Sequence, residues 1–257
     1  MTEHSEVIVH ADAELLAEAV AARLIVRLLD AQAARGQADV VLTGGRIAAA
    51  TYEAIRKSTA CNAVDWSHVD FWWGDERFLP AGDPDRNETQ ARAAFLDALP
   101  VDPSRVHPMP PSDGPDGNDP EAAATRYAEM LTAAARPGTA HLPHFDVVLL
   151  GVGEDGHVAS LFPEHPVSYE TRLVSAVRGS PKPPPVRITL TLPAINTGEE
   201  VWLIAAGAGK AGAVGIALAG AGPVQVPAAG VRGVDRTLWL LDRAAAHEVS
   251  PRFRSLR

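Results

Sequence analysis

The sequence predicts an α/β protein in which a mostly parallel sheet carries helices on both faces. Strand-like and helix-like segments alternate along the chain, which is the pattern of such a sheet. Several strand-like segments are apolar almost without a break, as strands buried on both faces are. The 257 residues, 46% hydrophobic and 21% charged, are enough for a full core. We expect one Rossmann-like domain over residues 1–257, with two smaller domains as the alternative.

The chain should begin as strand, helix and strand. Glu6–His10 is the first expected strand. A long helix follows, because Asp12 can cap its first turn, leucines and alanines recur at helical spacing, and Gly36 stops it. The second expected strand is Asp39–Leu42.

Two glycines lie between this second strand and the next helix. The strand ends in Thr43-Gly44-Gly45, and a helix over Ile47–Lys57 follows. Free backbone N–H groups and the helix dipole at such a turn favour a phosphate group. A plain tight turn explains the same residues equally well, so this stretch alone leaves both interpretations open.

Three consecutive charges follow the third expected strand, Val69–Trp73. Asp75, Glu76 and Arg77 lie where that strand ends, as either a solvated loop or part of a ligand site. Further on, Asn87 is expected to cap a helix that starts at the next residue.

The rest of the chain continues the alternation, punctuated by glycine and proline. A proline-rich segment over 180–185 should be stiff and extended. We expect a surface loop over 107–120, a helix over Glu121–Ala135, strands over Phe145–Leu150, Arg172–Val177, Arg187–Leu190, Glu200–Ala206 and Arg236–Leu241, a turn at Pro193–Asn196 and a short helix from Asp242.

The loop after Phe145–Leu150 is the strongest candidate site. Gly151, Gly153 and Gly156 allow sharp turns and close approach to a ligand, and His157 follows them. Ligands of open parallel sheets bind outside the carboxyl ends of the strands. Histidine suits proton transfer near neutral pH, so a general base is the expected role. A histidine merely satisfied within a turn is the structural alternative.

The same glycines spell GxGxxG, but a dinucleotide-binding site is disfavoured. That fingerprint requires a long helix directly after the glycines and an acidic residue about 20 positions later. Phe162 and Pro163 leave room for a short turn only, and the next expected strand ends at Arg178. Nicotinamide binding stays open only because an Arg can accommodate a 2′-phosphate.

A lysine follows another glycine turn after Glu200–Ala206. In GAGKAGAV, Lys210 stands at the start of a helix, where it and the free amides can bind one phosphate. The spacing differs from a Walker A loop, which argues against a nucleoside triphosphatase.

Composition argues against several partners. The formal net charge is −9, whereas nucleic-acid or anionic-membrane binding needs a basic face. One cysteine, Cys61, in a polar connection, excludes an internal disulfide and fits a reducing cytoplasm. The segment MTEHSEVIVHADAE has no signal pattern, and no run approaches the roughly 18 apolar residues of a membrane helix. We expect a soluble cytoplasmic protein, a monomer or weak homo-oligomer.

Five segments resemble one known family along nearly the whole chain. LTGG, GDERFLP with RNETQAR, FDVVLLGVGEDGHVASLFP, RITLTLPAIN and the GxGK segment are similar to those of the 6-phosphogluconolactonase family. The resemblance implies hydrolysis of 6-phospho-D-glucono-1,5-lactone to 6-phospho-D-gluconate in the oxidative pentose phosphate pathway, without a cofactor. It also implies a fold similar to glucosamine-6-phosphate isomerase/deaminase.

The resemblance further implies roles for single residues. His157 would activate the water that attacks the lactone carbonyl, and Asp155 would shape or polarise the loop. Such a reaction requires no metal and no covalent nucleophile. Arg46 stands where the family often has Ser or Thr, so charge would replace a hydroxyl there. Arg77 and Lys210 would hold the anionic substrate. The other expected contacts are the backbone and hydroxyl donors of Thr43, Gly44 and Gly45, together with Arg46, Asp75 and Arg187.

Two other functions are weighed against this one. An amino-sugar phosphate deaminase/isomerase would resemble this chain, but that family has a catalytic Glu where Phe162 stands and a Tyr in place of Arg77. A non-catalytic sugar-phosphate sensor would keep the phosphate contacts, yet the chain carries no helix-turn-helix extension.

Overall fold

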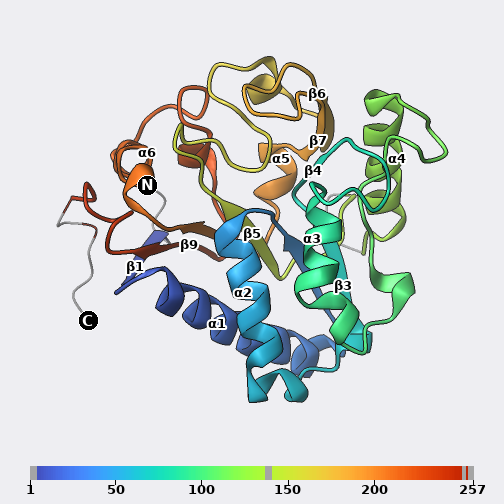
Figure 1. The fold of residues 1–257 in the computed structure, drawn as a ribbon, viewed down its shortest axis with the longest axis horizontal. Coiled ribbons are helices and arrows are strands. Elements are labelled where there is room, and N and C mark those ends of the chain that lie inside the picture. The colour runs from blue at the N-terminus through green and yellow to red at the C-terminus, as the bar shows by residue number, and fades with distance from the viewer. Residues whose placement is uncertain (1–4, 137–140, 251–252, 254–257) are drawn as a thin grey trace.

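A six-stranded sheet forms the centre of the protein (Figure 1). The computed structural model describes residues 5–136, 141–250 and 253; residues 1–4 of the N-terminal segment lie outside them. Paired strands run parallel in the order β1-β9-β8-β5-β2-β3. Each overlaps its expected range, which confirms the predicted α/β class. The bounds are β1 Ser5–His10, β9 Arg236–Asp242, β8 Glu200–Ala205, β5 Val147–Gly151, β2 Ala38–Leu42 and β3 Val69–Trp73.

The last strand of the sequence lies inside this sheet. β9 pairs with β1 on one side, from Ser5 opposite Thr237 to His10 opposite Asp242, and with β8 on the other. β1 and β3 form the two edges.

The first helix confirms both of its expected end signals. Asp12 Oδ1 accepts a hydrogen bond from Leu15 N at 2.9 Å, and the helix ends at Gly36 with φ of 77°. The described α-helices are α1 Ala13–Arg35, α2 Arg46–Lys57, α3 Asn87–Ala94, α4 Pro120–Ala133, α5 Leu192–Ile195 and α6 Ala211–Leu218. Short 3₁₀ turns cover Thr59–Ala63, Trp66–His68, Leu96–Ala98, Pro103–Arg105, Pro166–Tyr169, Ala208–Lys210 and Pro227–Gly230.

Helices α1 and α2 lie side by side against the main sheet (Figure 1). α1 contacts β9 and β2, and α2 contacts β8. α4 packs against a second sheet and reaches β3 through Tyr127, whose hydroxyl accepts from Trp73 N at 2.9 Å. None of the described helices has the length and apolar character needed to cross a membrane.

The second sheet is small and antiparallel, with the order β4-β7-β6. Its strands are β4 Asp75–Arg77, β7 Arg187–Leu190 and β6 Val174–Val177. The solvated-loop interpretation of the three charges is therefore wrong, because Asp75 and Glu76 are buried in a strand and hydrogen-bonded there.

The expected N-cap at Asn87 is also wrong. Asn87 is the first residue of α3, and its Nδ2 donates to the carbonyl oxygen of Asp75 at 2.9 Å. The cap comes from Glu76, whose carboxylate accepts from Asn87 N at 2.7 Å and Glu88 N at 2.9 Å. A side chain on a neighbouring strand thus replaces the local cap.

One smaller expectation fails as well. Asp242 closes β9, and turns rather than a helix follow it, although its carboxylate accepts from Ala245 N at 2.7 Å and from Gly207 N. Cys61 lies in a 3₁₀ turn and is buried.

Candidate functional site

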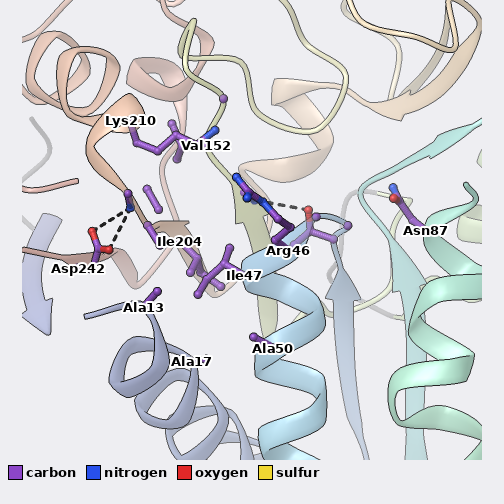
Figure 2. A pocket seen from close by; sticks show the side chains of 18 of the residues that line it. Ala13, Ala17, Arg46, Ile47, Ala50, Asn87, Val152, Ile204, Lys210 and Asp242 are labelled. Atoms are coloured by element: carbon purple, nitrogen blue, oxygen red, sulfur yellow. Dashed lines mark hydrogen bonds between the residues drawn. The ribbon is translucent and has the colours of Figure 1, made fainter. Parts of the chain in front are cut away.

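A cavity of about 1160 Å³ lies at the carboxyl ends of the parallel strands. Residues that directly follow β2 and β5 line it, as does the end of β8, as expected for an open α/β sheet. Its other end lies against alanines of α1 and α2 (Figure 2). The cavity brings together nine predicted site residues: Thr43, Gly44, Gly45, Arg46, Asp75, Arg77, His157, Arg187 and Lys210.

The turn after β2 is fixed by a buried tyrosine. Tyr52 Oη donates to the carbonyl oxygen of Thr43 at 2.7 Å and accepts from Thr43 N at 3.0 Å. Burial raises the pKa of Tyr52, so the hydroxyl stays protonated. A Cβ on Gly44 would lie 1.9 Å from Asn87 Oδ1, and Gly45 has φ of 98°. Both positions therefore require glycine.

Two cations enter the cavity from the starts of two helices. Figure 2 shows Lys210 at the start of α6 and Arg46 at the start of α2. Among the described residues neither forms an ion pair. Burial lowers the pKa of Lys210, and the charges of Lys182 and Arg46 act in the same direction, whereas the carboxylates of Glu154 and Asp155 oppose the shift. Cations without an ion pair at the start of a helix can bind an anion such as phosphate.

The glycine turn before Lys210 is held by the end of β9. Gly207 has φ of 95°, and its N–H donates to both carboxylate oxygens of Asp242, at 3.1 and 3.0 Å (Figure 2). Asp242 also lines the cavity. This contact fixes the position of the turn that leads into Lys210 and α6.

The acidic residues of β4 organise the opposite wall. Asp75 Oδ2 accepts from Ser160 Oγ at 2.6 Å. Glu76 is fully buried and accepts three backbone N–H groups, the third from Arg77 at 2.8 Å. Burial raises the pKa of Glu76 to about 7, although the nearby charge of Arg86 and those N–H bonds oppose the shift. Arg77 donates to the carbonyl oxygen of Asp85 at 2.6 Å and still lines the cavity.

The histidine of the glycine loop is paired with the predicted aspartate. His157 Nδ1 lies 2.5 Å from Asp155 Oδ1, so Asp155 contacts the cavity through His157. With Nδ1 engaged, Nε2 is the nitrogen left to accept a proton. A Cβ on Gly153 would lie 2.0 Å from His157 Nδ1, so a glycine is needed there.

The residues after this histidine match the sequence argument against a dinucleotide site. No helix follows the glycines directly; the first helical residues are the 3₁₀ turn Pro166–Tyr169. Phe162 is buried instead, with its ring 4.8 Å from that of His157. A fingerprint of the Rossmann type therefore lacks its helix here.

Lys182, Asn87 and Asp242 are among the residues on the cavity wall that were not predicted as site residues. Lys182 stands among prolines that the sequence analysis marked only as stiff. Asn87 lies in the RNETQAR segment, which was noted but interpreted as a cap. Asp242 offered no local signal, because its partner, Gly207, is distant in sequence.

Fold and cavity together define an α/β protein with a large cavity at the carboxyl ends of its parallel strands, in which several cations lie beside a histidine–aspartate pair. The family model described as glucosamine-6-phosphate isomerases/6-phosphogluconolactonase matches residues 11–239. The chain therefore belongs to this family.

Comparisons with single proteins agree with this assignment. The chain is 61% identical to a 6-phosphogluconolactonase of Streptomyces coelicolor, over 97% of this chain and 96% of the relative. It is 50% identical to that of Mycobacterium tuberculosis, over 94% and 97%. The solved 6-phosphogluconolactonase of Trypanosoma brucei is similar with a TM-score of 0.81 and 30% identity, covering 96% of this chain and 99% of that one.

The fold is also shared beyond the lactonases. A monomeric glucosamine-6-phosphate deaminase superposes with a TM-score of 0.77 at 21% identity, over 95% of this chain and 99% of that one. This likeness concerns the fold alone.

Proposed function

We propose that the chain hydrolyses 6-phospho-D-glucono-1,5-lactone to 6-phospho-D-gluconate, as a step of the oxidative pentose phosphate pathway. The observation that carries the proposal is the His157–Asp155 pair on the wall of a cavity that also holds unpaired cations. The names of the relatives support the same substrate.

In the proposed reaction His157 Nε2 takes a proton from water while the water oxygen bonds to lactone carbon C1. The carbonyl becomes an oxyanion. The bond from C1 to the ring oxygen then breaks, and the ring oxygen takes the proton back from His157. The acid formed at C1 loses its proton to solvent. Asp155 keeps Nδ1 protonated and stabilises the imidazolium between the two steps.

Substrate contacts in the proposal follow the charge of the walls. Lys210 and Arg46 bind the phosphate with the amides of Gly44 and Gly45. On the opposite wall, the sugar contacts Asp75, Arg77 and Arg187, which line the same cavity.

Several expectations belong to this proposal. They are one domain over residues 1–257, a cytoplasmic location, a monomer or weak homo-oligomer, and no nucleic-acid or membrane partner. The net charge of −9 supports the last of these.

A coupled assay tests the function. The lactone is generated from glucose 6-phosphate, and its loss is followed above the uncatalysed rate. His157→Ala should lower kcat by roughly 10²- to 10⁴-fold, the usual contribution of a general base. His68→Ala is the matched control, because His68 forms an exposed pair with Asp65 at 2.8 Å and does not line the cavity; it should keep full turnover.

Two results would overturn the proposal. One is wild-type turnover in folded His157→Ala. The other is release of ammonia from glucosamine 6-phosphate above background, since a deaminase needs a second acid or base and the ring of Phe162 transfers no proton.

A further inference from the structure

The proline-rich segment before β7 is fastened by one buried arginine. Arg187 Nη2 donates to the carbonyl oxygens of Lys182 and Pro183, both at 3.0 Å, and Arg187 Nε donates to that of Pro184 at 3.2 Å. Ser180 Oγ adds a bond to the Lys182 carbonyl oxygen at 2.8 Å. The backbone of a lysine is thus held on the wall of the cavity.

The side chain of Lys182 extends toward the histidine–aspartate pair. Its Nζ lies 3.7 Å from Asp155 Oδ1, the same oxygen that His157 Nδ1 contacts at 2.5 Å. Burial would raise the pKa of Asp155, but the bond from His157 and the charges of His157 and Lys182 hold it well below its usual range. The lysine is 44% exposed, so a ligand in the cavity can reach its ammonium group.

Charge in the proposed reaction appears at two places. The phosphate is anionic throughout, and Lys210 and Arg46 stand at the starts of two helices beside the cavity, where the helix dipole favours an anion. A second negative charge develops at C1, first as an oxyanion and then as a carboxylate. That charge arises next to His157, where Lys182 supplies an ammonium group with three donors on a flexible stem.

We propose that Lys182 is a catalytic residue that stabilises the negative charge at C1, in the oxyanion and then in the product carboxylate. This rests on the proposed lactone hydrolysis. During attack the ammonium group turns from Asp155 to the oxyanion and donates a hydrogen bond without giving up its proton. The proton of the attacking water still goes to His157. Arg187 acts as a positioning residue, because its guanidinium holds the backbone of the lysine.

Binding of two stable ligands tests this assignment without turnover. 6-Phosphogluconate carries a carboxylate at C1, and glucitol 6-phosphate has a neutral hydroxymethyl group there. In calorimetric titrations Lys182→Met should weaken 6-phosphogluconate binding by roughly 10- to 100-fold, the effect of losing a hydrogen bond to a charged group. Glucitol 6-phosphate binding should change by less than about 2-fold. Lys210→Met, the matched control, should weaken both ligands equally.

Kinetics gives a second readout. Lys182→Met should lower kcat on the lactone by about 10²- to 10³-fold, as loss of an oxyanion donor does, with KM little changed. Lys182→Arg should recover part of kcat because it restores the charge. Thermal unfolding of each variant checks that the fold is intact.

Equal weakening of both ligands by Lys182→Met, or no weakening of either, would overturn the assignment. A protein without lactonase activity that still shows the carboxylate-selective loss would refute the proposed function and leave an anion site at Lys182. The two failures are therefore distinct.

Discussion

The two ends of the parallel strands differ in whether all of their cations are paired. At the amino ends, Arg27 donates to Glu199 at 2.7 Å, and Arg35 pairs with Asp146, whose side chain is fully buried. At the carboxyl ends, Lys210 lines the cavity and has no ion pair among the described residues. Pairing stabilises the fold at one end, and the absence of a protein partner leaves a cation for a ligand at the other.

The paired end also resembles a metal site when only its residue types are considered. One ligand atom each from His144, Asp146 and Glu199 lie within 4.8 Å of one another. However, Arg27 and Arg35 already occupy these carboxylates, and a metal ion would have to displace two guanidinium groups. A ligand site is therefore better recognised by charges that have no protein partner than by the number of charged residues that lie close together.

The largest effect should follow from breaking the paired end. Asp146→Ala leaves Arg35 without its ion-pair partner, takes one of three carboxylates from Arg27 and removes the acceptor of Asp39 N at 2.8 Å. We expect a loss of about 3–5 kcal/mol in the free energy of unfolding, measured in urea, because half of a buried pair remains. Asp97→Ala, which removes an exposed pair with Arg92, should leave this free energy nearly unchanged. Equal losses of unfolding free energy in the two variants would contradict the expected difference between a buried and an exposed ion pair.

Removing the unpaired cation Lys210 should weaken substrate binding and leave the stability of the fold unchanged. Lys210→Met should raise KM for the phosphorylated lactone by roughly 10- to 100-fold, equivalent to about 1.5–3 kcal/mol. The free energy of unfolding should not fall, because burial lowers the pKa of Lys210 and so disfavours its charged form in the fold. A lactone without phosphate should be hydrolysed as by the wild type. If the variant also hydrolyses the lactone without phosphate more slowly, the lysine contributes to the chemical step or to the fold and not to phosphate binding.

A smaller effect should follow where the cavity wall is tightest. Gly44→Ala places a methyl group 1.9 Å from Asn87 Oδ1 and should cost about 1–3 kcal/mol of unfolding free energy, the range for overpacking. The double variant Gly44→Ala, Asn87→Ala should recover part of that cost, which a double-mutant cycle measures. Gly151→Ala is the matched control, since its nearest atom would be 3.7 Å away. Additive losses in the cycle would contradict the clash.

The sequence predicted those parts of the site that depend on local signals. The glycine turns before Arg46 and Lys210 and the loop before His157 each follow a buried strand, and the topology of parallel strands brings strand ends together. The cap that Glu76 supplies to α3 could not be predicted, because the acceptor lies on another strand. The hydrogen bonds from Arg187 to the proline-rich segment could not be predicted either, because they depend on which strands pair in the second sheet.

The place of β9 in the sheet bears on how the chain acquires its fold. Among the described strands, β1 comes first in the sequence and pairs with β9 alone, and β9 begins at Arg236. The emerging N-terminal strand must therefore wait, unpaired, until nearly all of the described chain has been synthesised. During that interval the backbone N–H and C=O groups of its apolar central residues, VIV, are unpaired and can pair with another chain. The pairing of β1 with β9 joins residues that are far apart in the sequence, and such pairing is slow. We therefore expect the sheet to be completed late in folding, with a risk of aggregation before then.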